Sequence, residues 1–478
     1  MSAGARQTTA REECTVGRDQ TTTSLLTGPP SMTSPEPGGV MAALRESVVP
    51  LTGTPDDFHI LMRRVGNAPL VLIGEASHGT HEFYRIRAQI TKRLIAEKGF
   101  NAVAIEGDWP DAYRVNYFVR GRGTDPDASL ALAGFRRFPQ WMWRNADVLD
   151  FVGWLRAYND ERPLASNVGF YGLDLYSLHT SMEAVLRYLN VVDPEAARRA
   201  AVRYACFSQY GADLQRYGQT TSLGMRPSCE REVIDQLVEL RRAAGEYVRR
   251  DGRVAADDLF FAEQNALVVA NAERYYRAMF ASNVSSWNLR DRHMAHILES
   301  LTTHLEREQG RAKVVVWAHN SHVGDARATE MGIDNQITLG QLARQRRGAD
   351  AVLVGFTTYG GSVTAASNWD EPAQRMIVQP ALDGSVEALF HDVGVHNFAL
   401  DLTQSSPAAS ALRVPRLERA IGVIYRPGTE RESHYFQASL SDQFDIILHY
   451  DFTRAVEPME RHGSWTQAEM PETYPVGV

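Results

Sequence analysis

Four side chains suited to acid–base chemistry each follow a short apolar run of the chain. They are Glu75, Glu106, Asp174 and His319. Runs of this kind are typical of buried strands in a parallel sheet. Because the carboxyl ends of parallel strands open onto one crevice in an α/β sheet, we expect these four side chains to share a site although they are far apart in sequence. Any one of them alone would more often be a helix cap or a turn former.

A histidine, His78, lies in the Gly-rich turn that starts with Glu75, at the beginning of a predicted helix. The positive end of the helix disfavours imidazolium, whereas Glu75 favours it and can fix the tautomer of the ring. A neutral, oriented imidazole is what a general base requires. Taken alone, a histidine in a turn is more often a surface or capping residue, so its neighbours decide the interpretation.

Arg87 is predicted to face inward from the same helix. It lies between Phe83 at i−4 and Ile90 at i+3, within the apolar stripe of the helix. A buried guanidinium cannot lose its proton and therefore needs a carboxylate nearby. We expect Glu75 or Glu106 to supply it, and a purely structural ion pair is the alternative.

Histidines also occur in two H-x-x-H pairs, His78 with His81 and His319 with His322. Four imidazoles and two carboxylates facing one cleft could hold a transition metal, so a metal-dependent site stays open as an alternative. The segment 81–85 is not a zincin motif (H-E-x-x-H), because Arg85 occupies the position of the second histidine. The chain contains neither a G-x-S-x-G nucleophile elbow nor a P-loop. Attack of water on a carbonyl remains, with a histidine as base and an arginine and a second histidine to stabilise the oxyanion.

The elements expected to position these residues alternate between strands and helices. Predicted strands are 69–74, 102–106, 168–171, 313–317, 351–357, 362–365, 420–425 and 444–450, and predicted helices include 80–98, 111–119 and 146–158. The pattern predicts an α/β fold with a central, mostly parallel sheet flanked by helices. Long amphipathic segments such as 230–250 and 258–279 indicate a large helical insertion that forms a lid or second lobe.

Domain boundaries follow from the same pattern. Residues 1–40 are rich in Thr, Ser, Gly and Pro and are predicted to be a disordered tail. Residues 41–180 and 311–478 are expected to form the two parts of an α/β catalytic core, with the helical insertion at 181–310. The length of 478 residues fits a core with a large insertion.

Composition excludes several classes of protein. The chain carries 50 basic and 58 acidic residues, a net charge of −8, which disfavours nucleic-acid binding as its main task. No apolar run reaches the length of a membrane span, and no secretory signal is evident. Its three cysteines, Cys14, Cys206 and Cys229, show no metal spacing and an odd total, which favours a reducing, cytoplasmic setting.

The sequence also resembles a known family, through GEASHGTHEF at 74–83, Arg87, the segment from Gly99 to Glu106, and AHNSH at 318–322. These motifs are similar to those of the erythromycin esterase family, and the likeness covers most of the chain from about Met41. The resemblance implies a two-part α/β fold and metal-independent hydrolysis of a macrolide lactone, without a cofactor. It implies His78 as the base that activates water, Glu75 and Glu106 as essential acids, Arg87 as the cleft arginine, and His319 and His322 as supporting histidines.

The substrate is less closely defined by these motifs. We expect a small-molecule ester or lactone, bound with help from Asp174 and from two aromatic residues, Trp109 and Tyr113, although buried aromatic residues are usually part of a core. Antibiotic inactivation is one role that the family likeness suggests, and many members of the family have no established macrolide substrate. A non-catalytic protein that binds a small molecule or a haem-like ligand in the cleft is the third alternative.

Overall fold

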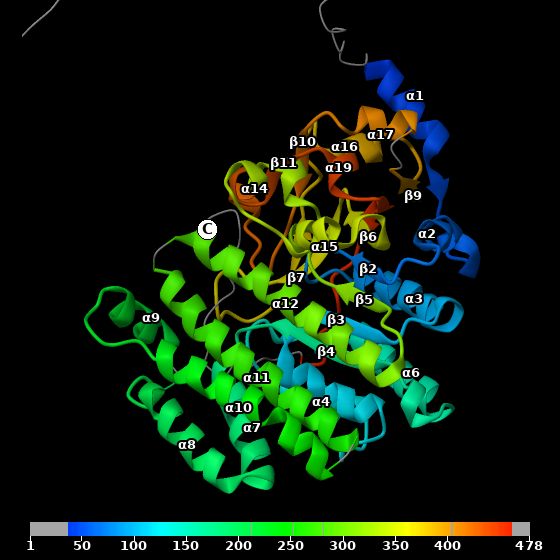
Figure 1. Cartoon of the computed structure of the whole chain (residues 1–478). Helices are drawn as coiled ribbons and strands as arrows, with labels where there is room; N and C mark the ends of the chain where they lie inside the picture. Colours follow the sequence, from blue (N-terminus) through cyan, green and yellow to red (C-terminus); the bar gives the residue numbers. More distant parts are fainter. Residues whose placement is uncertain (1–36, 212, 252, 281, 403–404, 461–478) are drawn as a thin grey trace, which may run out of the picture. The chain divides into compact units, whose positions relative to one another are not determined.

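The computed structural model describes residues 37–460 except 212, 252, 281 and 403–404, and it contains a central sheet of eight strands (Figure 1). In spatial order the strands are β1 (Val49–Pro50), β9 (Asn397–Asp401), β12 (Ile446–Tyr450), β6 (Ala351–Thr357), β2 (Leu70–Ile73), β5 (Val314–Trp317), β3 (Ala102–Asp108) and β4 (Gly169–Asp174). All neighbours from β12 to β4 are parallel, and β9 runs against both of its neighbours. The predicted fold class is confirmed.

Successive residues of the central strands point to opposite faces of the sheet and enter two separate cores. Leu70 and Leu72 of β2 belong to one core, and Val71 and Ile73 belong to the other. Helix α3 (His81–Lys98) packs Phe83, Ile86, Ile90 and Leu94 into the second core. It ends at Gly99, whose φ of +70° is the left-handed conformation that favours glycine at a helix end.

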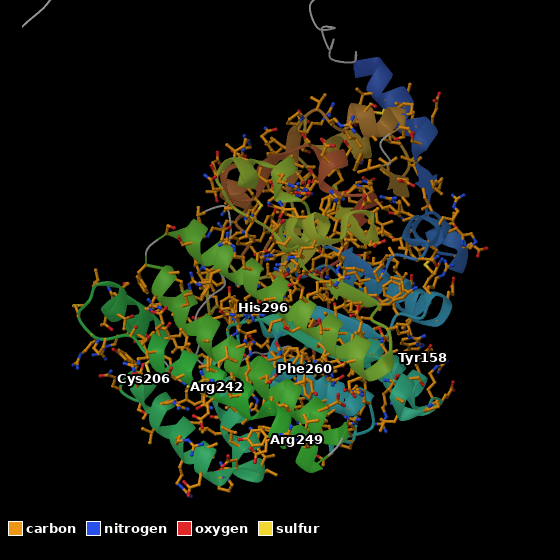
Figure 2. The ribbon with its side chains drawn as sticks, viewed as in Figure 1. Tyr158, Cys206, Arg242, Arg249, Phe260 and His296 are labelled. Carbon is orange, nitrogen blue, oxygen red and sulfur yellow. A yellow bond between two sulfur atoms is a disulfide. The ribbon has the colours of Figure 1, made fainter. Side chains whose placement is uncertain are left out.

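In the described residues between β4 and β5, the chain forms helices and no strand. They are α7 (Leu178–Val192), α8 (Pro194–Tyr204), α9 (Leu214–Ser222), α10 (Glu230–Asp251), α11 (Arg253–Ala278) and α12 (Asn283–Gln309). Their apolar side chains join the first core, and Phe260 of α11 (labelled in Figure 2) contacts Trp109 at 5.6 Å between ring centroids. The division of the core into two parts around an insertion at 181–310 stays a prediction.

The remaining helices are short or lie at the edges of the fold. They are α1 (Pro37–Ser47), α2 (His59–Val65), α4 (Trp109–Val119), α5 (Ala128–Ala131), α6 (Ala146–Asp160), α13 (Asn320–Val323), α14 (Glu330–Ile333), α15 (Leu339–Arg347), α16 (Val386–His391), α17 (Pro407–Ala411), α18 (Glu430–Ser433) and α19 (Leu440–Gln443). Residues 1–36 of the predicted tail lie outside the described residues, and its last four begin α1.

Two small sheets accompany the central one. One contains β13 (Phe452–Thr453), β7 (Gly360–Ala365) and β8 (Gln374–Val378), and the other pairs β10 (Arg416–Arg419) with β11 (Tyr435–Ala438). The predicted strand at 420–425 is wrong, since this segment makes isolated bridges only. Most of its apolar residues are buried because it runs beside the 75–78 turn, where Ile421 N–H donates to Ala76 O at 2.9 Å.

Cys206 and Cys229 form a disulfide bond in the helical segment, with their Cα atoms 6.0 Å apart (Figure 2 labels Cys206). This differs from the reduced cysteines expected from the odd total, because 23 residues separate the pair in sequence and only the packing of the helices brings them together. Within the described ranges, no helix combines the length and apolarity needed to cross a membrane.

Candidate active site

The structure brings the four predicted strand-end side chains to the same edge of the sheet. Glu75 follows β2, Glu106 lies in β3, Asp174 ends β4 and His319 follows β5. All four are buried. Hydrogen bonds link the strand ends, since His319 N–H donates to Glu106 Oε2 at 2.7 Å and Asn320 N–H donates to Glu75 O at 2.8 Å. Neighbouring parallel strands, β2 beside β5 and β5 beside β3, make these contacts possible.

His78, Glu75 and Arg87 form one buried chain of contacts. His78 Nδ1 lies 2.9 Å from Glu75 Oε1, and Glu75 Oε2 lies 2.8 Å from Arg87 Nη2. A carboxylate at Nδ1 assigns the proton to that nitrogen in the neutral ring, so Nε2 carries the lone pair. Nε2 faces Glu106, whose Oε1 is 4.0 Å away. The guanidinium of Arg87 also packs over the rings of Tyr84 and Trp317.

Two glycines allow the turn that carries His78. A Cβ atom on Gly74 would lie 2.1 Å from Asn320 Oδ1, and one on Gly79 would lie 1.8 Å from Thr364 O. Tyr84 Oη donates to His78 O at 2.6 Å, and Ile421 O accepts from His78 N–H at 3.3 Å. Hydrogen bonds from the backbone of His78 to Tyr84 and to the distant Ile421 therefore help to hold the turn in place.

Arg290 of α12 joins the second group of charges. Its Nη2 lies 2.8 Å from Glu106 Oε1 and 2.6 Å from Asp174 Oδ2, and its Nε donates to Asp174 Oδ1 at 3.1 Å. Burial alone would raise the pKa of Glu106, but the charges of His322 and Arg290 hold it well below its usual range. Arg290 likewise outweighs burial and lowers the pKa of Asp174. Both carboxyl groups are therefore ionised at neutral pH.

The two histidines after β5 have opposite electrostatic surroundings. His322 Nδ1 lies 2.9 Å from Asp291 Oδ2, Nε2 lies 3.3 Å from Glu106 Oε1, and the ring stacks on Trp287 at 4.3 Å. Burial and Arg290 oppose its charge, but the two carboxylates raise its pKa to about 9. His319 is different, because burial holds its pKa well below the usual value. His319 is therefore neutral, and His322 is charged at neutral pH.

We expect the charge on His322 to make stability depend on pH. A group whose pKa is raised on folding stabilises the protein below its unfolded value of about 6.5, and this contribution is lost as pH rises toward about 9. The contribution is on the order of 3 kcal/mol. The variant Asp291→Asn removes the carboxylate beside His322 and should therefore remove most of this contribution. The amide oxygen of the new Asn can still accept from Leu339 N–H.

Urea unfolding of wild type and Asp291→Asn across this pH range measures the effect. The difference between the two free energies of unfolding should be largest at and below about pH 6.5 and shrink toward pH 9, where the wild-type imidazolium is also lost. A constant difference across the range would contradict the assignment.

Other predicted site residues are placed elsewhere. Trp109 and Tyr113 are buried in the first core, where Trp109 Nε1 donates to Phe261 O and Tyr113 Oη donates to Asp257 O. This placement is that of core aromatic residues. His81 is turned toward α6 and pairs with Asp147 at 2.8 Å, so the two H-x-x-H pairs do not converge. Among the described residues, no three His, Cys, Asp or Glu side chains are arranged to hold a metal ion.

Arg290 and Asp291 contact the site residues but were not predicted from the sequence to belong to the site. Both lie within the buried stripe of α12 formed by Trp287, Met294 and Leu298. The same argument that selected Arg87, a charge inside an apolar stripe, would have selected this pair.

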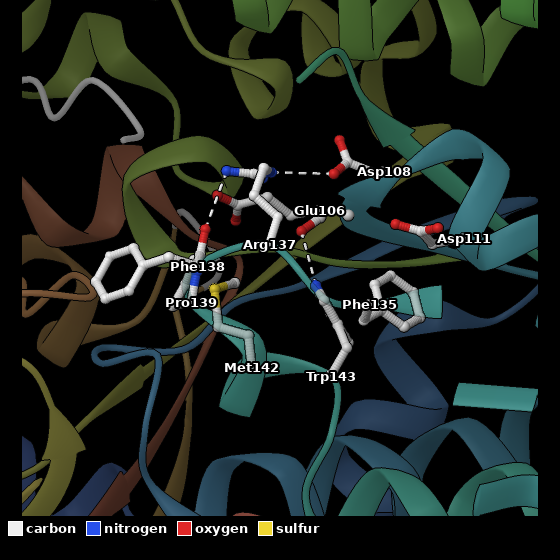
Figure 3. A pocket seen from close by; sticks show the side chains of 10 residues that line it. Glu106, Asp108, Asp111, Phe135, Arg137, Phe138, Pro139, Met142 and Trp143 are labelled. Carbon is white, nitrogen blue, oxygen red and sulfur yellow. Dashed lines mark hydrogen bonds and ion pairs between the residues drawn. The ribbon is translucent and has the colours of Figure 1, made fainter. Parts of the chain in front are cut away.

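A pocket adjoins this cluster of charges (Figure 3). Its lining residues come from the end of β3 and from the following loops and helices, namely Glu106, Gly107, Asp108, Asp111, Phe135, Arg137, Phe138, Pro139, Met142 and Trp143. Glu106 thus links the pocket to His78, His322 and Arg290. The arrangement offers an oriented base, a group of buried charges and an adjacent space for a ligand.

Comparisons with known proteins identify similar sequences and a shared fold. The chain is 24% identical over 360 residues to an Escherichia coli protein named erythromycin esterase type II, a match that covers 72% of this chain and 82% of that protein. A crystal structure of a succinoglycan biosynthesis protein is similar with a TM-score of 0.70 at 20% identity, covering 88% of this chain and 98% of the other. An erythromycin esterase mutant in its open conformation is similar with a TM-score of 0.61 at 17% identity, covering 84% and 95%. The family model for erythromycin esterase matches residues 95–453, and the chain therefore belongs to the erythromycin esterase family.

Proposed function

We propose that this protein is a carboxylic ester hydrolase in which His78 acts as a general base on water. The observation that carries the proposal is the buried contact of His78 Nδ1 with Glu75, which orients the ring and leaves Nε2 facing Glu106, a residue that also lines the pocket. Family membership supports the reaction class. The protein named erythromycin esterase type II supports a lactone or other ester as substrate.

Each charged group has a role in the proposed mechanism. Glu75 orients His78 and stabilises the imidazolium that forms when it takes a proton from water. Arg87 forms a 2.8 Å ion pair with Glu75 and thereby helps to fix the carboxyl group that contacts His78. We assign the stabilisation of the developing negative charge on the carbonyl oxygen to His319 and His322, and the positioning of these histidines to Glu106. Asp174 holds Arg290 beside Glu106.

Ester turnover by the purified protein tests the proposal. We expect release of acid and alcohol from lactones or simple esters in a panel that includes macrolides. Activity should persist after dialysis against a chelator, because the proposed proton transfers use side chains alone. Loss of activity on chelation with recovery on adding a divalent metal would favour the metal-dependent alternative. No turnover of any ester in the panel would overturn the proposed reaction class.

A further inference from the structure

Asp108 lies in the same pocket as Glu106, two residues further along β3. Figure 3 shows its carboxyl group beside Arg137, with Glu106 close by. Under the proposed function, the ester reaches His78 from this pocket, which shares Glu106 with the site of His78. An acid in the pocket wall would then be within reach of the departing alcohol, a part of the reaction to which no residue has been assigned.

The backbone at this point is irregular in a way that affects Asp108. The register between β3 and β4 shifts between Ile105 and Asp108, which marks a β-bulge. Gly172 of β4 permits it, since a Cβ atom there would lie 2.4 Å from Gly107 O. Bulges redirect side chains and are common beside active sites. Here the bulge leads directly from Glu106 to Asp108, which precedes α4.

The carboxyl group of Asp108 is buried and is only partly satisfied by the described residues. Its side chain is 5% exposed, and Oδ2 accepts from Arg137 Nε at 3.1 Å. Oδ1 is buried and has no partner of full hydrogen-bond geometry among the described residues, although the backbone N–H of Tyr176 lies near enough to the carboxyl group to lower its pKa. A buried polar atom of this kind calls for a partner, and a ligand in the pocket can supply one.

The buried position of Asp108 shifts its titration toward the protonated form. Burial raises its pKa above that of an ordinary aspartic acid, and the nearby carboxylate of Asp174 adds to the increase. Arg137 and the backbone N–H of Tyr176 act in the opposite direction and do not fully compensate. The surroundings therefore suit an acid that gives up a proton during a reaction.

We propose that Asp108 is the general acid that protonates the leaving alcohol oxygen; this assignment rests on the proposed function. In the first step, His78 takes a proton from water while the water oxygen bonds to the ester carbon and the π electrons of the carbonyl move onto its oxygen, from which they return in the second step. In the second step, the bond from carbon to the alcohol oxygen breaks, and that oxygen receives the proton of Asp108. The product acid and His78 then return one proton to Asp108 and one to solvent, which leaves a carboxylate and an alcohol.

Two esters that share one acyl group test the assignment. An alkyl ester has a poor leaving group that needs a proton, whereas a 4-nitrophenyl ester releases a stable anion without one. We expect Asp108→Asn to lower kcat for the alkyl ester by about 10²- to 10⁴-fold and to affect the 4-nitrophenyl ester far less. Residual activity on the 4-nitrophenyl ester also shows that the variant is folded.

Arg137→Met is the control, because it removes the ion pair but keeps the acid. This variant should preserve the ratio of kcat for the alkyl ester to kcat for the 4-nitrophenyl ester. It should also move the alkaline limb of the pH profile of kcat for the alkyl ester to higher pH, since loss of the cation raises the pKa of Asp108. Asp108→Asn should lose that limb. If Asp108→Asn slowed both esters equally, Asp108 would be structural and the assignment wrong, with the role of His78 untouched. If the wild type cleaved neither ester, the proposed function itself would fail.

Discussion

His78→Asn should lower kcat for ester hydrolysis by about 10²- to 10⁴-fold while the fold is retained. The amide nitrogen of Asn can still donate to Glu75 Oε1, which lies 2.9 Å from His78 Nδ1 in the wild type. The variant therefore keeps the contact with Glu75 and loses the ring nitrogen that accepts a proton. Single-turnover kinetics on a substrate cleaved by the wild type measure the loss in the chemical step directly.

His81→Asn is the matched control for this experiment. His81 lies three residues after His78 and is the first residue of α3. Its side chain pairs with Asp147 and not with a residue of the site. It should leave kcat nearly unchanged. Equal rates for His78→Asn and the wild type would refute the role of His78, and equal losses in both variants would indicate a general disturbance of α3.

Arg290→Met should have the largest effect on stability of any single change in the site. It would leave Glu106 and Asp174 buried without the guanidinium that lies 2.8 Å and 2.6 Å from them. Removing one member of a buried ion pair typically costs about 3–5 kcal/mol in the free energy of unfolding. The loss should be smaller at low pH, where the two carboxyl groups become protonated and no longer need a counter-charge.

Urea unfolding at neutral pH measures the effect, and Arg231→Met provides the comparison. Arg231 is 90% exposed and lies 3.8 Å from Asp235, so its loss should cost less than about 1 kcal/mol. A second change, Asp174→Asn in the Arg290→Met background, removes one unpaired carboxylate and should recover part of the stability. Equal losses for the two arginine variants would show that the buried cluster does not stabilise the fold.

The buried carboxylates of this cluster outnumber its two cations, Arg290 and His322, so both cations are needed to stabilise them. Glu106, Asp174 and Asp291 are countered by Arg290 and by His322, whose raised pKa keeps it charged at neutral pH. Glu106 touches both cations and is also bound by the backbone of His319. A change at Glu106 would therefore disturb stability and catalysis together, which makes it a poor test of mechanism, whereas His78 and Asp108 separate the two.

The parallel strands of the central sheet, the helix that carries Arg87 and the convergence of strand-end polar residues could be predicted from the sequence, whereas the antiparallel strands β1 and β9 at one edge were not predicted. Alternating side chains in runs such as 70–73 and 314–317 enter opposite cores, and all of them are apolar, which is the pattern of a strand buried on both faces. The inward direction of Arg87 followed from helix periodicity, and its ion pair with Glu75 agrees with that expectation. These features depend on local sequence, so a local pattern reveals them.

Contacts between distant segments were decided only by the tertiary structure. Local pattern suggested a strand at 420–425, but the segment packs beside the turn at 75–78 and supports it instead. His81 matches His78 in type and spacing, yet Asp147 holds it on the other side of the turn. Arg290 reaches Glu106 across 184 positions, and Trp109 lies in the core because α11 covers it. The residue types and their periodicity are properties of the chain, whereas the partner of a buried charge depends on which elements pack together, and a single sequence does not record that choice.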